Sequence, residues 1–575
     1  MADRGPLTLA AGRSIRLKGG EPMLVALILL YVLVTGLWPL ARLLAEAFGP
    51  DDSGRVMGLI RDGLESRAAR RALGNTLLAS GGSVLVSLVL GTFLALALGL
   101  LRLPGRVAMT FLAISPLLIP SQIMALAWIE LTGASSPILA PLGLAPAPGS
   151  TNPLYSGGGI VWLMGIEHMP LVFLAVRAGL AGIPADLVEA ARVGGAGTLR
   201  ITTRIILPLC LPQMLAGAML AFSAAVGNFG IPALLGIPGR FPMLTTLIYQ
   251  RLNGFGPTVL GQVAVLALAL ILPAGAALLL RATVIARLGF PVARGRRFTA
   301  FSAGRAERAL ALGLWLLLGV LMILPIAALL ATALVPALGM RLTLSTLTLG
   351  NFAEVAADPV IRRAFVNSLL LSLAAALISA LVAVPFAWLV AVRRNPVLRR
   401  LNALADAPFV VPGTVLALAV ILVFLPPLPL IGVSLYGTAA ILLVAYLARF
   451  LPLVLRPVEA LAQSLEPALD EAGRIAGASS PRRVLRLFAP LAAPAIMAGA
   501  VLIVMTAFNE LTLSSLLWSA GTETVGVMIF ALQQQGSSTA AAAVSALSLL
   551  VILTLAALVD RAARHRAPET LPWRG

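Results

Sequence analysis

Long apolar runs alternate with short polar segments along the whole chain. A helix that crosses a membrane needs about 20 mainly apolar residues, and twelve runs in this sequence reach that length. Their approximate limits are 23–46, 75–101, 107–131, 158–180, 209–235, 258–280, 309–334, 366–392, 401–425, 437–457, 491–517 and 540–559. The pattern predicts an all-α polytopic membrane protein with about twelve transmembrane helices.

Composition supports a membrane protein over a soluble one. Hydrophobic residues make up 59% of the 575 residues and charged residues 11%, against about 45–50% and about 25% in ordinary soluble domains. A chain with so few polar residues cannot cover a water-facing surface of its own size, which excludes a soluble multidomain enzyme. The single cysteine, Cys210, excludes an intrachain disulfide and a cysteine metal cluster.

Positive charge lies mostly in the segments between the apolar runs. The formal net charge is +19, from 42 Lys and Arg against 23 Asp and Glu. Nucleic-acid binding would need a basic patch on a soluble surface, whereas arginines in short loops orient membrane helices. We therefore expect contact with membrane lipid and none with nucleic acid.

The distribution of arginine also predicts the orientation of the chain. The segments 132–157, 426–436 and 518–539 contain no Lys or Arg, whereas most other loops and both chain ends are rich in arginine. By the positive-inside rule, the N- and C-termini of this multi-pass protein are expected in the cytoplasm, with the spans in the cell inner (plasma) membrane. Two segments, 47–74 and 335–365, depart from the rule because they carry arginines on the predicted outer side.

An internal repeat divides the sequence into two halves. Residues 70–80 match residues 362–372 at an offset of 292, and Pro120 matches Pro412 at the same offset. Further along, the offset becomes 282. Because each half has six spans, an even number, both halves should enter the membrane in the same direction and form a parallel repeat about an axis along the membrane normal.

The repeat sets the predicted domain boundaries. The first half covers residues 1–284, with its transmembrane domain at about 72–282. The second half covers residues 309–575, with its transmembrane domain at about 364–560. The arginine-rich stretch 285–308 between them is predicted to be a cytoplasmic linker.

A long predicted cytoplasmic loop lies between the fourth and fifth spans of each half. Alanine and leucine favour a helix at its start, and Gly195 in the first loop and Gly477 in the second end this helix by permitting positive φ. Thr198 and Ser480 then stand where the N-cap of a second short helix is expected. Each loop is therefore predicted to form two short helices with a break between them.

The spacing in these loops resembles the EAA loop of binding-protein-dependent ABC importer permeases: Glu-Ala-Ala, three residues, Gly, nine residues, Ile, one residue and Leu-Pro. The first copy fits at every position, with Glu189, Ala190, Ala191, Gly195, Ile205, Leu207 and Pro208. The second copy keeps Glu471, Ala472, Gly477 and Pro490. It departs from the pattern at Gly473, Leu487 and Ala489.

The resemblance implies a type I ABC importer permease with both transmembrane domains fused in one chain. In that family each such loop is a coupling helix that docks on a cytoplasmic ATP-binding subunit, and a periplasmic substrate-binding protein delivers the substrate. Two ATP-binding subunits are implied here. The chain has no phosphate-binding loop of its own, because its single lysine, Lys18, is followed by Gly19 rather than Ser or Thr. We expect a non-catalytic subunit without a cofactor or a bound metal.

Polar residues inside predicted spans form a second candidate site. Asn228 lies in the fifth span of the first half, and Asn509 and Glu510 lie in the fifth span of the second half. Amides and carboxylates at membrane depth usually face a cavity or a partner helix. These residues can therefore line a translocation pathway on the pseudo-twofold axis or fix helix packing by hydrogen bonds. For Glu167, in the fourth span, packing is the favoured interpretation.

The substrate is indicated by resemblance alone. The stretches 116–120, 228–236, 244–249 and 411–417 resemble the iron(III) subgroup of these permeases. Thiamine, polyamine and phosphonate permeases look similar in the same segments and stay as alternatives.

Two other functional classes are alternatives to the importer. A twelve-span secondary transporter can also show parallel six-span repeats, but it does not need two cytoplasmic helices with an acid at the same place. A membrane enzyme would need converging catalytic residues, which the sequence lacks.

Overall fold

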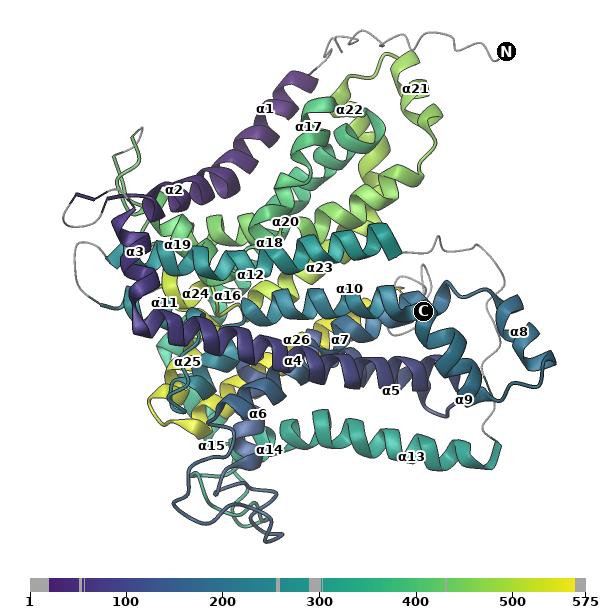
Figure 1. Ribbon diagram of the computed structural model, residues 1–575. Helices are drawn as coiled ribbons and strands as arrows, with labels where there is room; N and C mark the ends of the chain where they lie inside the picture. The colour runs from purple at the N-terminus through teal and green to yellow at the C-terminus, as the bar shows by residue number, and fades with distance from the viewer. Residues whose placement is uncertain are drawn as a thin grey trace.

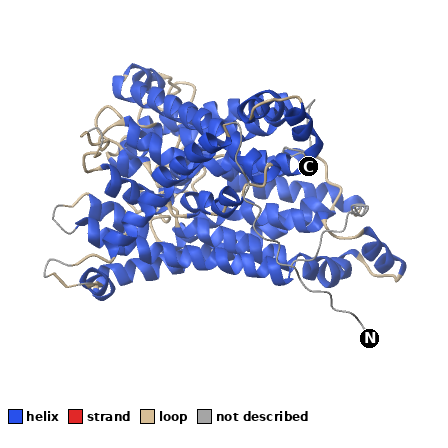
Figure 2. Ribbon diagram, turned by 90° about the horizontal axis from the view of Figure 1, so that it is seen from above, coloured by secondary structure: helices blue, strands red, loops and turns tan. Residues whose placement is uncertain are grey.

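The computed structural model of the chain describes residues 20–50, 54–55, 57–254, 259–288, 301, 304–429 and 432–563. Over these ranges the chain forms helices and loops and no β-strand (Figure 2). Ten of the described helices are long and apolar enough to cross a membrane. The number of spans rises to twelve if each of two bent helix pairs is counted as one span. The predicted all-α fold with about twelve transmembrane helices is therefore confirmed.

The described residues of the first half form twelve α-helices. They are α1 (Glu21–Val32), α2 (Trp38–Ala47), α3 (Gly58–Glu65), α4 (Arg67–Leu100), α5 (Arg106–Ile114), α6 (Ser121–Thr132), α7 (Gly157–Ala181), α8 (Ala185–Val193), α9 (Thr198–Ile201), α10 (Leu207–Val226), α11 (Leu244–Leu252) and α12 (Val259–Leu288). Short π-helical segments lie at η1 (Leu33–Leu37), η3 (Thr202–Ile206) and η4 (Pro232–Gly236).

The second half repeats this order. Its helices are α13 (Glu307–Leu318), α14 (Leu324–Ala333), α15 (Gly350–Ala357), α16 (Pro359–Ala387), α17 (Pro396–Leu401), α18 (Ala407–Val410), α19 (Gly413–Phe424), α20 (Ala439–Ser464), α21 (Pro467–Ile475), α22 (Ser480–Arg483), α23 (Ala489–Phe508), α24 (Ser514–Leu517), α25 (Val525–Gln534) and α26 (Ser538–Ala563). Its π-helical segments are η6 (Gly319–Ile323), η7 (Trp388–Val392) and η9 (Val484–Phe488).

Equivalent hydrogen bonds relate the two halves. The N–H of Leu244, which begins α11, donates to Thr76 Oγ1 at 2.9 Å. The N–H of Val525, which begins α25, donates to Ser368 Oγ at the same distance. Because Thr76 and Ser368 are matched residues of the sequence repeat, the same helix contact is built twice.

Prolines bend two of the predicted spans. The spans expected at 107–131 and 401–425 are helix pairs bent by 107° and 113°. Each break falls at a proline with extended backbone, Pro120 with ψ 144° and Pro412 with ψ 138°. Proline supplies no N–H, so it ends the first helix and stands directly before the next one.

Other prolines are accommodated inside continuous spans. Four π-helical segments, η1, η3, η6 and η9, each end two residues before a proline; these prolines are Pro39, Pro208, Pro325 and Pro490. A proline inside an α-helix clashes with the carbonyl of the preceding turn, and the wider π turn relieves that clash. The four helices therefore run on as spans of 27 or 29 residues.

The first span of each half packs on the other half (Figure 1). Tyr31 Oη, in α1, donates to the carbonyl oxygen of Leu447 in α20 at 2.8 Å. Thr332 Oγ1, in α14, donates to Glu130 Oε2 in α6 at 2.9 Å. Val25, Ile28 and Val32 of α1 are buried mainly among second-half residues. Buried residues of α13 and α14, such as Ala311 and Leu329, lie in a cluster formed mainly by first-half residues. The two sequence halves are therefore interlocked in space.

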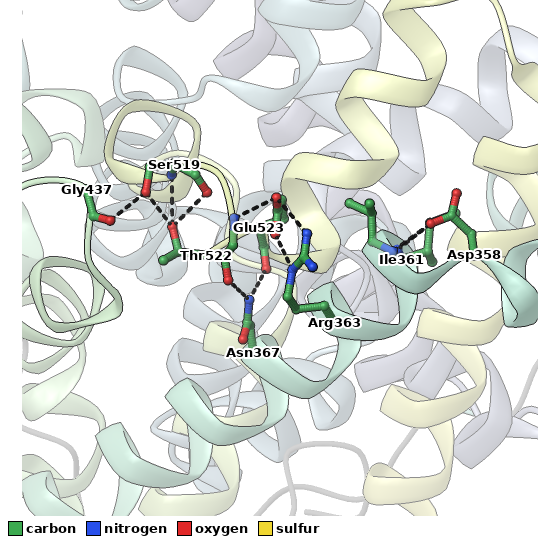
Figure 3. Close-up of polar contacts among 10 residues, drawn as sticks. Asp358, Ile361, Arg363, Asn367, Gly437, Ser519, Thr522 and Glu523 are labelled. Atoms are coloured by element: carbon green, nitrogen blue, oxygen red, sulfur yellow. Dashed lines mark hydrogen bonds and ion pairs between the residues drawn. The ribbon is translucent and has the colours of Figure 1, made fainter.

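An ion pair connects the start of α16 to the loop before α25 (Figure 3). The guanidinium of Arg363 donates to both carboxylate oxygens of Glu523, at 3.0 and 3.3 Å. The N–H of Gly521 also donates to this carboxylate, at 2.9 Å. Burial alone would raise the pKa of Glu523, but these hydrogen bonds outweigh burial and hold its pKa below the ordinary value.

We expect Glu523→Gln to lower the stability of the protein in detergent by about 1 kcal/mol at neutral pH, since Arg363 is half-exposed. A carboxyl with a lowered folded-state pKa stabilises the fold above its unfolded pKa and loses this effect as the pH falls through the folded value. The melting temperatures of the wild type and of Glu523→Gln should therefore begin to converge at about pH 4.3, the ordinary glutamate pKa, and should coincide below the lower pKa of the folded protein. The matched control is Glu46→Gln, which removes an exposed ion pair with Arg42. A difference that persists unchanged at low pH would contradict the assignment.

Candidate coupling loops and translocation site

Both predicted coupling loops form two helices separated by a glycine turn. Gly195 has φ 75° and Gly477 has φ 77°, so the predicted positive-φ breaks are confirmed. The predicted N-caps are displaced by one residue: α9 begins at Thr198 and α22 at Ser480, with Gly197 and Ser479 as the capping residues. The helix needs an extended residue before its first turn, and the backbone is extended at these two preceding positions.

The predicted residues of the first loop lie on two elements. Glu189, Ala190 and Ala191 are in α8, with Ala190 exposed and the other two half-buried. Gly195 is exposed in the turn. The last three, Ile205, Leu207 and Pro208, lie where η3 joins α10. The second helix of the loop therefore continues directly into the fifth span, rather than ending before the membrane.

The second loop has the same arrangement. Glu471 and Ala472 are exposed on α21, Gly477 is exposed in the turn, and Pro490 is exposed near the start of α23. Figure 1 shows α8 and α21 at the same end of the helical assembly, beyond the ends of the long helices. The two acidic residues Glu189 and Glu471 are thus carried by equivalent helices at one end of the molecule.

Two exposed apolar side chains on these loops were missed by the sequence reasoning. Val193 is 91% exposed and Ile475 is 88% exposed, and the two are equivalent at the repeat offset of 282. Each is the last residue of its short helix. Each loop therefore presents one exposed apolar side chain at the equivalent position. A comparison of the two loops for shared apolar residues, beyond the motif, would have found them.

The polar residues predicted inside the fifth spans lie just beyond the helix ends. The spans expected at 209–235 and 491–517 are too long, because α10 ends at Val226 and α23 at Phe508. Gly227 and Asn509 occupy the two C-cap positions. Asn228, Asn509 and Glu510 therefore belong to breaks in the helices, not to their interiors.

These breaks meet the proline breaks at one place, which we call the central junction: residues 120–122, 227–230, 412–414 and 509–512. Gln122 Nε2 donates to the carbonyl oxygen of Asn509 at 2.8 Å, across the two halves. Gly227 packs so closely on Pro412 that an added Cβ would lie 3.3 Å from its ring. Asn509 and Gly227 are equivalent at the offset of 282, and Gln122 lies two residues after Pro120, the equivalent of Pro412. Corresponding breaks of the two halves therefore meet at the central junction.

In the first half, the side chain of Asn228 is held by Glu167. Asn228 Nδ2 donates to Glu167 Oε2 at 2.7 Å, and Ser121 Oγ donates to the other carboxylate oxygen. Thr245 Oγ1 donates to the carbonyl oxygen of Asn228 at 2.9 Å. Packing by hydrogen bonds, the interpretation favoured for Glu167, is therefore observed, and it includes Asn228.

In the second half, the equivalent positions carry different charges. At the offset of 282, Glu167 and Asn228 become Arg449 and Glu510. The Glu510 carboxylate accepts from the backbone N–H of Leu513 at 2.9 Å and from that of Ser514 at 3.1 Å, and it interacts electrostatically with Arg449. The first half thus has an acid with an amide where the second half has a guanidinium with an acid.

Asn509 has unused hydrogen-bonding capacity in the central junction. It is 2% exposed, and within the described residues neither its Nδ2 nor its Oδ1 has a hydrogen-bond partner. Irregular backbone at membrane depth is tolerated only where protein covers it or where it lines a water-filled passage. The central junction can therefore offer hydrogen bonds and charge to a polar solute. Across the described residues no group of three or more His, Cys, Asp or Glu could hold a metal ion.

The comparisons with known proteins follow the two repeats. A family model described as "Binding-protein-dependent transport system inner membrane component" matches residues 85–285 and 383–570. The chain is 28% identical over 524 residues to the probable ABC transporter permease protein y4fN of Sinorhizobium fredii, covering 88% of this chain and 90% of that protein.

Two further relatives differ in their named substrates. The chain is 23% identical over 531 residues to the ferric transport system permease protein FbpB of Actinobacillus pleuropneumoniae, covering 90% of this chain and 73% of that protein. It is 29% identical over 240 residues to the putative 2-aminoethylphosphonate transport system permease protein PhnU of Salmonella typhimurium, covering 40% of this chain and 82% of that protein.

We expect Asn228→Ala to destabilise the protein by about 1–3 kcal/mol, because it leaves a carboxylate oxygen of Glu167 without its donor. Thermal unfolding in detergent measures this loss. The matched control is Asn253→Ala, which removes an exposed amide that donates to the carbonyl oxygen of Tyr249, and it should change the melting temperature little. Equal effects of the two substitutions would contradict a buried role for Asn228.

Proposed function

Since this chain belongs to the family of binding-protein-dependent transport system inner membrane components, with the family's domain present twice, we propose that it carries iron(III) across the inner membrane for an ATP-driven ABC importer. The chain is a multi-pass permease of the ABC importer class. In our proposal a periplasmic binding protein delivers the substrate and separate cytoplasmic ATP-binding subunits, two in number, hydrolyse ATP. The permease itself catalyses no reaction.

The pair of equivalent loops is the observation that carries this proposal. Two short helices with glycine turns, each with an acid and an exposed apolar residue, suit two similar partner surfaces. We assign ATPase coupling in the first loop to Glu189, Ala190, Ala191, Gly195, Ile205, Leu207 and Pro208. In the second loop we assign it to Glu471, Ala472, Gly477 and Pro490. The exposed Val193 and Ile475 add an apolar contact to each.

The proposed orientation follows from charge. The end that bears the coupling loops is taken as cytoplasmic, together with the N- and C-termini, because the segments 132–157, 426–436 and 518–539 lack Lys and Arg. The binding protein would then dock on these segments without Lys or Arg.

The proposed pathway runs through the central junction. Asn228, Asn509 and Glu510 come from both halves. The side-chain amide of Asn509 has no hydrogen-bond partner among the described residues, which supports a polar passage there. ATP binding would draw the two coupling loops together and tilt the halves from an inward-facing to an outward-facing arrangement. A solute released by the binding protein would then enter the passage.

Iron(III) is the substrate best supported by two observations. The segments 116–120, 228–236, 244–249 and 411–417 resemble iron(III) permeases, and one relative that aligns over most of the chain is a ferric transport permease. A phosphonate is the second candidate, because one relative is a putative 2-aminoethylphosphonate permease. Thiamine and polyamines complete the set to be tested.

We expect uptake into proteoliposomes to require the permease, the partner ATP-binding subunits, the binding protein and ATP together. Of iron(III), 2-aminoethylphosphonate, thiamine and a polyamine offered separately, iron(III) should be accumulated. Uptake of another solute under the same requirements would refute iron(III) alone. Uptake driven by an ion gradient without the ATP-binding subunits would refute the importer mechanism.

We expect the double substitution Val193→Asp and Ile475→Asp to abolish uptake, because it puts two charges into the proposed apolar contacts with the ATP-binding subunits. Both side chains are exposed, so the melting temperature of the isolated permease should stay near that of the wild type. Co-purification of the ATP-binding subunits measures the contact directly. The control is Leu142→Asp, an exposed apolar position in the loop 133–156, which should keep the subunits bound. Normal uptake by the double variant would count against the docking surface.

A further inference from the structure

Glu21, the first residue of α1, contacts the second coupling loop. Glu21 Oε1 accepts from Ser480 Oγ at 3.1 Å and from Arg393 Nε at 2.9 Å. The guanidinium of Arg483 lies 3.5 Å from the same oxygen. Glu21 is 2% exposed, so its carboxylate is almost completely withdrawn from water. It therefore depends on these partners from the opposite half of the sequence.

Arg483 connects this carboxylate to the coupling helix and to the core. It is 6% exposed, and its Nε donates to Asp470 Oδ1 in α21 at 2.9 Å. Its Nη1 donates to the carbonyl oxygen of Ala478, in the glycine turn, at 3.0 Å. Its guanidinium lies over the ring of Trp388, 5.3 Å from the centroid. The coupling helix, the turn and the start of α1 are thus joined through one side chain.

The first coupling loop is held by different chemistry. At the offset of 282, Asp470 and Arg483 are replaced by Val188 and Ile201, which are both buried. This loop instead contacts Phe301, a residue that precedes α13 in the sequence. The N–H of Phe301 donates to the carbonyl oxygen of Leu100 at 2.7 Å, and the guanidinium of Arg192, in α8, lies 4.4 Å from the centroid of its ring.

The opposite ends of these two first spans lie between the halves. Apolar residues of α2, such as Leu43 and Ala47, are buried in one cluster with residues of α12 from the first half and α19 from the second. In the same way, α14 packs against α6 of the first half and α26 of the second. Each first span thus runs from one coupling loop to the contact between the halves.

We propose that α1–α2 and α13–α14 are struts that carry the movement of each coupling loop to the contact between the halves, with Glu21 and Phe301 as the positioning residues that fasten the struts. This inference rests on the proposed function of the loops. Helices are stiff along their axes, and the π-helical turns before Pro39 and Pro325 keep each strut continuous. Without its fastening, a loop could follow its ATP-binding subunit while the strut stays behind.

Two measurements on the full-length permease test the struts. The first is hydrogen–deuterium exchange of the permease alone in lipid nanodiscs. Glu21→Gln should raise exchange several-fold in residues 467–483 and leave residues 185–201 unchanged. Phe301→Ala should do the reverse. The control Glu46→Gln, at an exposed ion pair on α2, should change neither loop.

The second measurement is the amount of solute imported per ATP hydrolysed in the reconstituted complex. Glu21→Gln and Phe301→Ala should each lower this ratio several-fold while ATP hydrolysis continues, and Glu21→Asp, which keeps the charge, should restore most of it. A purely structural role would lower the amount of folded protein without changing the ratio.

The outcomes separate the two proposals. Unchanged exchange, or equal changes in both loops, would overturn the fastening roles, and changed exchange with an unchanged import ratio would overturn the struts. If wild-type uptake needs no ATP-binding subunit, the proposed function fails and the transmission of movement fails with it. The exchange pattern would then still decide whether Glu21 and Phe301 fasten the loops.

Discussion

The need to bond every backbone polar group inside the protein governs this structure. Hydrocarbon offers no hydrogen bonds to a free N–H or C=O, yet four helix breaks meet in the central junction. They persist because the halves cover one another: Gln122 bonds the carbonyl of Asn509, and Gly227 lies against Pro412. The same pairing that shields irregular backbone also brings amides and carboxylates from both halves together.

The sequence predicted the features that depend on local pattern. Apolar runs located the spans, the repeat related the halves, and the glycines at 195 and 477 marked the turns. It could not distinguish a proline that breaks a helix, such as Pro120, from one that a π turn accommodates, such as Pro208, because each follows an aliphatic residue in a largely apolar stretch. It also could not find the contacts of Arg483, since its partner Glu21 lies at the other end of the chain and no spacing rule links them.

The two halves use one geometry with different chemistry. Glu167 and Asn228 stand where the other half has Arg449 and Glu510, and the buried Val188 and Ile201 stand where the other half has Asp470 and Arg483. Buried charge requires its partners in good geometry, whereas apolar packing tolerates small shifts. The second half is therefore the more sharply defined of the two at the loop, and a substitution accepted in one half need not be accepted in its counterpart.

Because the first span of each half packs on the other half, the two halves are held together by more than the covalent connection between them. Since α1 completes the bundle of the second half and α13 that of the first, the covalent connection between residues 288 and 304 is not what unites them. A gene divided at that point would produce two polypeptides that each lack an outer wall until they associate. Assembly of such a pair would be obligatory, and neither product would be expected to persist alone in the bilayer.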